Sequence, residues 1–180
     1  MSAPSLFTPS GHRKYLDREE RLRFLAAVEK RHGPERLLCL LLIWSGARLS
    51  EVLALRPEHV SFTERMVVFR SLKKRGQIVH RHVPLPLDVI HELSKPHALP
   101  LPWARTQAWA AVKNIMKEAR IQGPQACPRG LRHSFAIHAV TSGVPLHLIQ
   151  RWLGHTRLET TAIYSQVLGA EERSIAERMW

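Results

Sequence analysis

Apolar residues recur at helical spacing near the start of the chain, after a polar stretch that ends at about Lys14. We expect residues 1–14 to form an N-terminal arm and the periodic segment Asp17–Arg31 to form a helix. The apolar residues that repeat within this helix are Leu22, Leu25 and Val28. Gly33 and Pro34 end the helix, because both residues interrupt a helical pattern.

A second helix is expected from Pro34, since proline suits the first position of a helix. It contains the run Leu37–Trp44, which is apolar on every side and therefore predicts a helix buried at the centre of the fold. Gly46 ends this helix. A short amphipathic helix should follow over Leu49–Leu55, before Pro57 stops it.

The pattern then changes to β-branched and aromatic residues, which predict a hairpin. Met66–Ser71 and Ile78–Val83 are expected to be strands around a basic turn, with one face on the core. The cations at the tip of this turn are Lys73, Lys74 and Arg75. A turn that merely aids solubility is the alternative interpretation of these charges.

The second half of the chain is mostly helical in pattern, beyond a proline-containing linker at His91–Trp103. Thr106 can cap a helix that runs to about Arg120. The apolar residues expected on one side of it are Trp109, Val112 and Met116. Three further helices are expected over Arg129–Ser142, Pro145–Leu153 and Leu158–Val167, with Gly143 and Gly154 as C-terminal stops.

These elements predict a mainly α fold with a small antiparallel β-sheet (α+β). Residues 15–168 are expected to form one domain, and residues 169–180 a tail with a small amphipathic helix at Ala170–Met179.

The charge of the chain indicates a polyanionic partner. With 27 Lys and Arg against 15 Asp and Glu, the formal net charge is +12, which favours nucleic acid, although solvated surface charge is the plainer interpretation of composition alone. The two cysteines, Cys39 and Cys127, form no paired framework, so an intracellular, reducing, cytoplasmic location is expected. The longest apolar run has eight residues, whereas a membrane span needs about 20, so no membrane partner is expected.

Three phrases carry candidate chemistry, and they are Ser45–Glu51 (SGARLSE), Gly130–Ser134 (GLRHS) and Leu153–Tyr164 (LGHTRLETTAIY). Their residue types suit attack of a tyrosine on a DNA phosphodiester, and their order and separation favour a single site. Over about Leu16–Val167 the chain resembles the catalytic domain of the tyrosine recombinases, also called phage-type integrases. The resemblance implies a site-specific recombinase that cleaves and rejoins DNA through a covalent 3′-phosphotyrosine, without metal, ATP or another cofactor.

Arg48 and Arg132 are expected to clamp the phosphate. Negative charge develops on the equatorial oxygens in the transition state, and two guanidinium forks can bind those oxygens with charge-assisted hydrogen bonds. A salt bridge to Glu51 is the alternative role of Arg48, and by the resemblance Glu51 orients this arginine, so the two roles are compatible. His133 is expected to pack beneath the clamp.

Tyr164 is the nucleophile that the resemblance implies. A phenol has a reference pKa of about 10, so cationic neighbours must favour its phenolate. Lys73 is the expected general acid for the departing 5′ oxygen, with Lys74 as the fallback. His155 is expected to donate a hydrogen bond to a nonbridging phosphate oxygen.

One position departs from the family pattern. The family usually has histidine three positions before the second catalytic arginine, and Arg129 stands there. A guanidinium can hold a phosphate but cannot serve as a base near neutral pH. We expect Arg129 to keep the phosphate-binding role, whereas the role of that histidine in deprotonating Tyr164 does not carry over.

Other basic residues are candidate contacts to the DNA backbone, namely Lys74, Arg75, Arg105, Arg151 and Arg157. No metal site is expected, because the histidines lack zinc-site spacing. A two-metal nuclease is disfavoured because Asp17 and Asp88 are the only aspartates.

Double-stranded DNA and further copies of the chain are the partners that the resemblance implies, as a tetramer in synapsis. The tail would dock on a neighbouring protomer or fold onto its own domain. The family usually has a separate DNA-binding domain before the catalytic one, and only about fifteen residues precede the match here. This resembles the short recombinases of fimbrial inversion systems; a removed domain or an accessory DNA-binding protein are the alternatives.

Two other function classes remain open. A catalytically weak DNA-binding regulator would use Ser134–Leu153, which resembles a helix-turn-helix. A type IB topoisomerase shares the same catalytic residue types, and relaxation of supercoils without a defined site would identify it.

Overall fold

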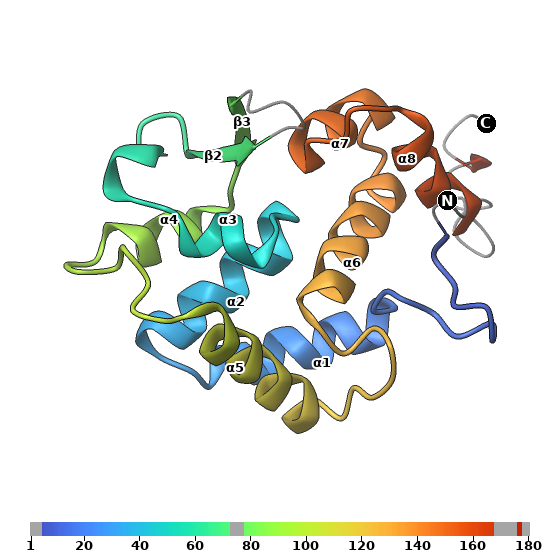
Figure 1. The fold of residues 1–180 in the computed structure, drawn as a ribbon, viewed down its shortest axis with the longest axis horizontal. Coiled ribbons are helices and arrows are strands. Elements are labelled where there is room, and N and C mark those ends of the chain that lie inside the picture. The colour runs from blue at the N-terminus through green and yellow to red at the C-terminus, as the bar shows by residue number, and fades with distance from the viewer. Residues whose placement is uncertain (1–4, 73–77, 168–175, 178–180) are drawn as a thin grey trace.

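The computed structural model describes residues 5–72, 78–167 and 176–177, and Figure 1 shows a mainly helical fold beside a small antiparallel sheet, as predicted. The longer helices are α1 (Arg18–Glu29), α2 (Gly33–Ser45), α4 (Leu87–Ser94), α5 (Arg105–Glu118), α6 (Pro128–Thr141) and α7 (Leu146–Leu153). The short elements are α3 (Leu49–Leu53), η1 (Pro57–His59), α8 (Glu159–Ala162) and η2 (Ile163–Val167). The sheet has the order β1 (Val60–Ser61), β2 (Met66–Leu72) and β3 (Ile78–Pro84).

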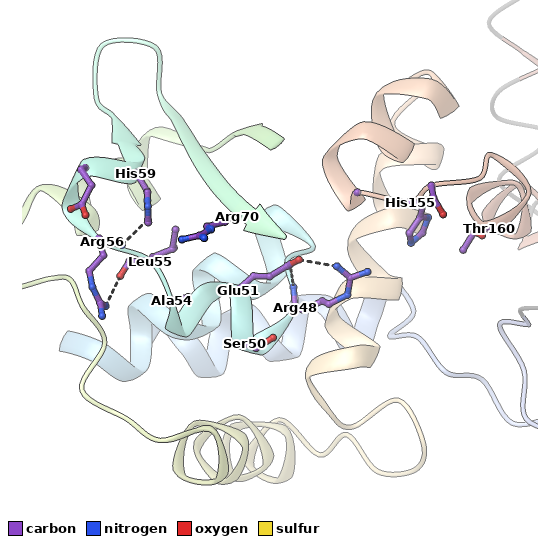
Figure 2. A pocket seen from close by; sticks show the side chains of 13 residues that line it. Arg48, Ser50, Glu51, Ala54, Leu55, Arg56, His59, Arg70, His155 and Thr160 are labelled. Atoms are coloured by element: carbon purple, nitrogen blue, oxygen red, sulfur yellow. Dashed lines mark hydrogen bonds and ion pairs between the residues drawn. The ribbon is translucent and has the colours of Figure 1, made fainter. Parts of the chain in front are cut away.

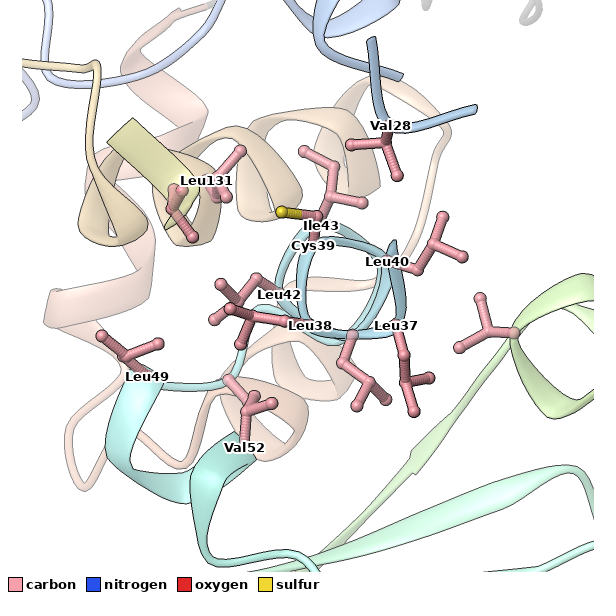
Figure 3. Packing of buried hydrophobic residues seen from close by; sticks show 14 of the residues in the cluster. Val28, Leu37, Leu38, Cys39, Leu40, Leu42, Ile43, Leu49, Val52 and Leu131 are labelled. Carbon is pink, nitrogen blue, oxygen red and sulfur yellow. The ribbon is translucent and has the colours of Figure 1, made fainter. Parts of the chain in front are cut away.

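Helix α2 forms the centre of the core, which confirms the prediction from its apolar run. Figure 3 views the helix end-on, with buried side chains on every side of it. All residues from Leu37 to Ile43 are buried. Gly46 ends the helix with a φ of +61°, and a Cβ there would lie 2.4 Å from Cδ1 of Phe135 in α6. The chain therefore turns tightly under α6 and delivers Arg48 to the start of α3.

Helix α1 has the predicted position, and only part of its apolar set is buried. Its start is fixed by a capping box between Asp17 and Glu20. The residues that it buries include Arg21, Phe24 and Val28, whereas Leu22 is 58% exposed. Leu22 does not share the buried face of Val28, because the two residues are six positions apart and their side chains diverge around the helix.

Two predictions for the segment before α5 were wrong. The supposed linker from His91 begins inside α4, whose Val89, Ile90 and Leu93 are buried. Helix α5 is capped at Ala104, whose backbone N–H donates to Oε1 of Gln107 at 2.9 Å, so Thr106 lies within the helix.

The buried face of α5 also differs from the predicted one. Trp109 is 48% exposed, while Ala108, Val112, Ile115 and Met116 face the core. Helix α5 packs against α1, α2 and α3, and Ala108 lies fully buried on the face that meets the core. The smaller residue therefore lies inside and the larger one outside.

The hairpin has the predicted strands, together with the short strand β1 that the pattern did not indicate. In β2 and β3, Phe69 lies opposite Arg81. The predicted tip cations Lys73, Lys74 and Arg75 lie outside the described residues.

The last helices contain two of the three candidate phrases, Gly130–Ser134 and Leu153–Tyr164. Helices α6 and α7 agree with their predictions to within one residue at each end, whereas Leu158–Val167 is divided into α8 and η2. Near this end of the chain a second apolar cluster includes Leu6 and Tyr15 from the N-terminal arm together with Ile163 and Tyr164. The arm therefore packs against the segment that carries Tyr164, and Figure 1 shows its course beside α8. The predicted tail helix lies outside the described residues, apart from Ala176 and Glu177.

Candidate active site

A cleft of about 1360 Å³ separates the α3 and hairpin side of the molecule from the segment that follows α7. Figure 2 shows Arg48, Glu51 and Arg70 on one side and His155 on the other. Arg56 also lines the cleft. The lining holds three arginines against two glutamates, Glu51 and Glu58, so the net charge of these groups is positive and the cleft suits an anion such as a phosphate backbone.

Arg48 is held at the start of α3 by Glu51. The Glu51 carboxylate accepts from the Arg48 backbone N–H at 2.7 Å and from Nη1 at 2.8 Å. The Arg48 side chain is 47% exposed, while the Glu51 side chain is buried. The guanidinium therefore reaches the cleft from a buried anchor, and the salt bridge that was the alternative role of Arg48 is present.

Arg132 lies in the first half of α6 and joins two other chain segments. Its Nη1 donates to the carbonyl of Gly46 at 2.6 Å and its Nη2 to the carbonyl of Leu153 at 2.7 Å. Burial lowers the pKa of Arg132 to about 10, which leaves it charged at neutral pH. Each terminal nitrogen has a second N–H, so the side chain still has donors for a phosphate oxygen.

Tyr164 is buried and hydrogen-bonded to His133, a contact that was not predicted from the sequence. The Tyr164 hydroxyl oxygen lies 2.9 Å from Nδ1 of His133. Burial raises the pKa of Tyr164 to about 12, although Arg132 acts in the opposite direction. In this structure the phenol therefore holds its proton, so the cationic neighbours do not compensate for burial.

His133 is neutral at physiological pH. Burial lowers its pKa to about 4, with further lowering by the positive charges of Arg132 and Arg129. A neutral imidazole has one ring nitrogen free to accept a hydrogen bond. His133 can thus accept the hydroxyl proton of Tyr164 at Nδ1.

His155 follows Gly154 at the end of α7 and lines the cleft. Its Nδ1 lies 2.9 Å from the hydroxyl oxygen of Thr161, and its ring stacks with that of Tyr164 at a centroid distance of 6.4 Å. Burial lowers the pKa of His155 to about 3, and nearby Arg132 and Arg48 lower it further. The ring is therefore neutral at pH 7.

The remaining predicted site residues are not all brought together. Arg129 is exposed at the start of α6, and its charge acts on His133. The other predicted DNA contacts in the described part of the chain, which are exposed and do not line the cleft, are Arg105, Arg151 and Arg157.

Three arginines near the cleft were not predicted from the sequence, namely Arg56, Arg70 and Arg81. Arg81 is buried, and its Nη2 donates to Glu51 at 2.6 Å. Strand alternation could have revealed Arg81, because it shares a strand face with Val79 and Val83, where a charge is unusual.

The described residues contain neither a metal-ligand cluster nor a membrane-spanning helix. Among them, no group of three or more His, Cys, Asp or Glu side chains is arranged to hold a metal ion. No helix in this part of the chain has the length and apolarity that crossing a bilayer requires.

The chain is similar to known proteins over nearly its whole length. The model of the phage integrase family matches residues 14–171. Tyrosine recombinase XerA of Thermococcus kodakarensis is 30% identical over 178 residues, which cover 92% of this chain and 62% of the relative. This chain spans less than two thirds of the length of the curated relatives it matches first.

Solved structures share the fold. A XerH site-specific recombinase bound to palindromic difH substrate, in a post-cleavage complex, superposes with a TM-score of 0.72 at 20% identity, covering 97% of this chain and 53% of that chain. The catalytic domain of bacteriophage HP1 integrase gives a TM-score of 0.69 at 23% identity, and the match covers 91% of this chain and 93% of that chain.

Proposed function

Because this chain belongs to the phage integrase family, we propose that it is the catalytic part of a site-specific DNA recombinase that acts through a covalent 3′-phosphotyrosine at Tyr164. One observation carries the proposal. The buried hydroxyl of Tyr164 lies beside His133, and its ring stacks on His155 at the edge of a cationic cleft. Two histidines from separate segments thus contact the same phenol, and one of them, His155, also lines the cleft.

In the proposed reaction, the Tyr164 oxygen attacks a DNA phosphorus and the bond to the 5′ oxygen breaks. The products are a phosphodiester between Tyr164 and the 3′ end and a free 5′ hydroxyl. This linkage conserves the bond energy, so rejoining needs no nucleoside triphosphate. Arg48 and Arg132 bind the nonbridging oxygens, and loss of one such donor typically costs about 10²–10³ in rate.

His155 contributes a third donor to the same phosphate. A hydroxyl of Thr161 that donates to Nδ1 of His155 leaves the ring proton on Nε2. Because the ring is neutral, this N–H donates without adding a charge. The leaving 5′ oxygen takes its proton from Lys73, with Lys74 as the fallback, because these lysines follow the strand Met66–Leu72 in the sequence.

The proton of Tyr164 passes to His133. Arg129 occupies the family's usual histidine position and cannot accept a proton, whereas Nδ1 of His133 is already within hydrogen-bond reach. The pKa values of about 12 for Tyr164 and about 4 for His133 keep the proton on the phenol before DNA binds. Transfer therefore accompanies attack on the phosphorus.

Double-stranded DNA is the proposed partner, with a tetramer of the chain joining two duplexes. The charge of +12 and the arginines of the cleft support this assignment. Tyr164 is only 2% exposed, so the segment that carries it must move toward the cleft when DNA binds.

A catalytically weak DNA-binding regulator is the second candidate, because the nucleophile is buried and Arg129 replaces the usual histidine. The two candidates differ in whether a covalent adduct forms. The test incubates the protein with nicked duplexes from DNA that flanks its own gene. A denaturant-resistant adduct that is absent in Tyr164→Phe supports the recombinase. No adduct despite tight binding favours the regulator or a half-enzyme that needs a partner.

A further inference from the structure

Arg81 is a buried charge in the middle of strand β3. It is 4% exposed, and its guanidinium carbon lies 4.8 Å from the centre of the Phe69 ring on the neighbouring strand. Arginine is rarely buried unless it is paired. Burial lowers the pKa of Arg81, although the nearby Glu51 carboxylate opposes the shift. Such a side chain is costly to desolvate, so its contacts indicate what it does.

The first contact joins Arg81 to the support of Arg48. Nη2 of Arg81 donates to Oε2 of Glu51 at 2.6 Å, and the same carboxylate binds the backbone and the guanidinium of Arg48. Glu51 is therefore shared by one arginine that faces the cleft and one that is buried. Without Arg81, the Glu51 carboxylate would lose the contact that fixes it from the strand side.

The second contact joins Arg81 to the end of α7. Its Nε donates to the carbonyl of Trp152 at 2.7 Å, and the next carbonyl, that of Leu153, accepts from Arg132. Gly154 follows with a φ of +69°, and a Cβ on it would lie only 3.1 Å from Cδ of Arg81. The arginine thus packs against the turn that immediately precedes His155.

We infer that Arg81 is a positioning residue for strand cleavage, which sets the spacing of Arg48 and His155 across the cleft. Its guanidinium reaches Glu51 on one side and the α7 turn on the other, so one rigid planar group links the supports of two phosphate-binding side chains. The inference rests on the proposed function. It assigns Arg81 no contact with DNA, because the side chain is buried.

The test compares two substrates, one of which has a methyl group in place of a nonbridging oxygen at the scissile phosphorus and therefore lacks the negative charge there. A duplex that the protein cleaves carries either its normal phosphate or an uncharged methylphosphonate at the scissile position. If Arg81 acts by aiming the charge of Arg48, Arg81→Met should slow adduct formation about 10- to 100-fold on the phosphate. On the methylphosphonate the rate of adduct formation should fall about threefold or less, because the transition state carries less negative charge that Arg48 has to neutralise.

Arg21 supplies a matched control. It is also buried, its guanidinium lies 4.5 Å from the centre of the Trp44 ring, and it contacts the Ile43 carbonyl, but it does not contact Glu51 or the α7 turn. Arg21→Met should therefore change the rate on both substrates by the same factor. Arg81→Lys retains the charge but cannot contact Glu51 and the α7 turn at the same time. This variant should fold, and its rate of adduct formation should lie between those of the wild type and Arg81→Met.

The outcomes separate this inference from the proposed function. If the wild type forms no adduct, the proposed function fails and the inference fails with it. In a second outcome, the wild type forms an adduct, while the rate of adduct formation by Arg81→Met and Arg81→Lys falls by the same factor on both substrates or does not fall at all. Either result would mean that Arg81 only supports the fold. DNA affinity measured in parallel should remain within about threefold of the wild type, since binding is dominated by exposed cations.

Discussion

Nδ1 of His133 lies 2.9 Å from the hydroxyl oxygen of Tyr164. His133 directly follows Arg132 in α6, so one helix supplies both the arginine proposed to bind phosphate and the hydrogen-bond partner of the proposed nucleophile. Because Arg129 cannot accept a proton, His133 is the proposed acceptor of the phenol proton.

Replacing His133 by Phe retains a ring of similar shape and removes the acceptor nitrogen. We expect the rate of adduct formation to fall about 100-fold or more, which is the usual contribution of a positioned base. Single-turnover cleavage of a nicked duplex measures this rate. His138→Phe is the control, because His138 lies in the same helix but contacts Trp44 instead. Equal rates for wild type and His133→Phe would exclude His133 as the acceptor.

Arg129→His restores the usual family residue. Since Arg129 is exposed and His133 already contacts Tyr164, we expect the cleavage rate to change by less than about tenfold. Loss of one phosphate contact should also reduce the salt dependence of DNA binding by about one counterion. Both quantities are measured on the same duplex at two or more salt concentrations. A hundredfold higher cleavage rate in Arg129→His would instead mean that Arg129 strongly reduces the activity of the natural site.

Arg70 lines the cleft on the outward face of β2. Arg70→Ala should weaken DNA binding and reduce the slope of log K against log salt by about one, because one phosphate contact is lost. Titrations of a fluorescent duplex at several salt concentrations give this slope. Lys30→Ala is the matched control, since Lys30 is an exposed cation that does not line the cleft. An unchanged slope in Arg70→Ala would remove Arg70 from the DNA interface.

Two histidines should make the fold sensitive to acid. The pKa of His133 is lowered to about 4 and that of His155 to about 3, whereas an unfolded histidine titrates near about 6.5. Between these values the unfolded state binds more protons, so stability falls as the pH drops below about 6.5. Charged groups that act on His155 are Arg132, Arg48 and Arg81.

Urea unfolding at pH 7, 6 and 5 checks the direction and the size of this effect. Each histidine can contribute up to about 1.4 kcal/mol per pH unit in this window. His155→Gln removes one titrating group and should flatten the dependence. A free energy of unfolding that stays constant from pH 7 to pH 5 would contradict the neutral state of both rings.

The sequence was sufficient to predict the central helix, the hairpin and the short motifs. Leu37–Trp44 had no polar side, so any helix there had to be buried, and α2 is. Trp109 was placed wrongly because periodicity gives the spacing of a buried face but not its phase. That phase depends on neighbours from distant segments, such as the packing of α1 on α5.

The environment of the site could not be predicted from the motifs. The pKa of Tyr164 depends on burial by a cluster that includes Leu6 and Tyr15 from the arm, a long-range contact that no local pattern encodes. Arg81 was detectable in principle from strand alternation, but its bond to Glu51 required the fold. Predictions for Lys73, Lys74, Arg75 and most of the tail fall outside the described residues.

The most direct measurement maps the amino acid that becomes linked to DNA. Wild-type protein is incubated with the nicked duplexes, the adduct is isolated under denaturing conditions and digested, and mass spectrometry locates the nucleotide-bearing residue. We predict a 3′-phosphate ester on Tyr164 and no adduct in Tyr164→Phe. Linkage to any other residue, or an adduct that persists in Tyr164→Phe, would contradict the proposed reaction.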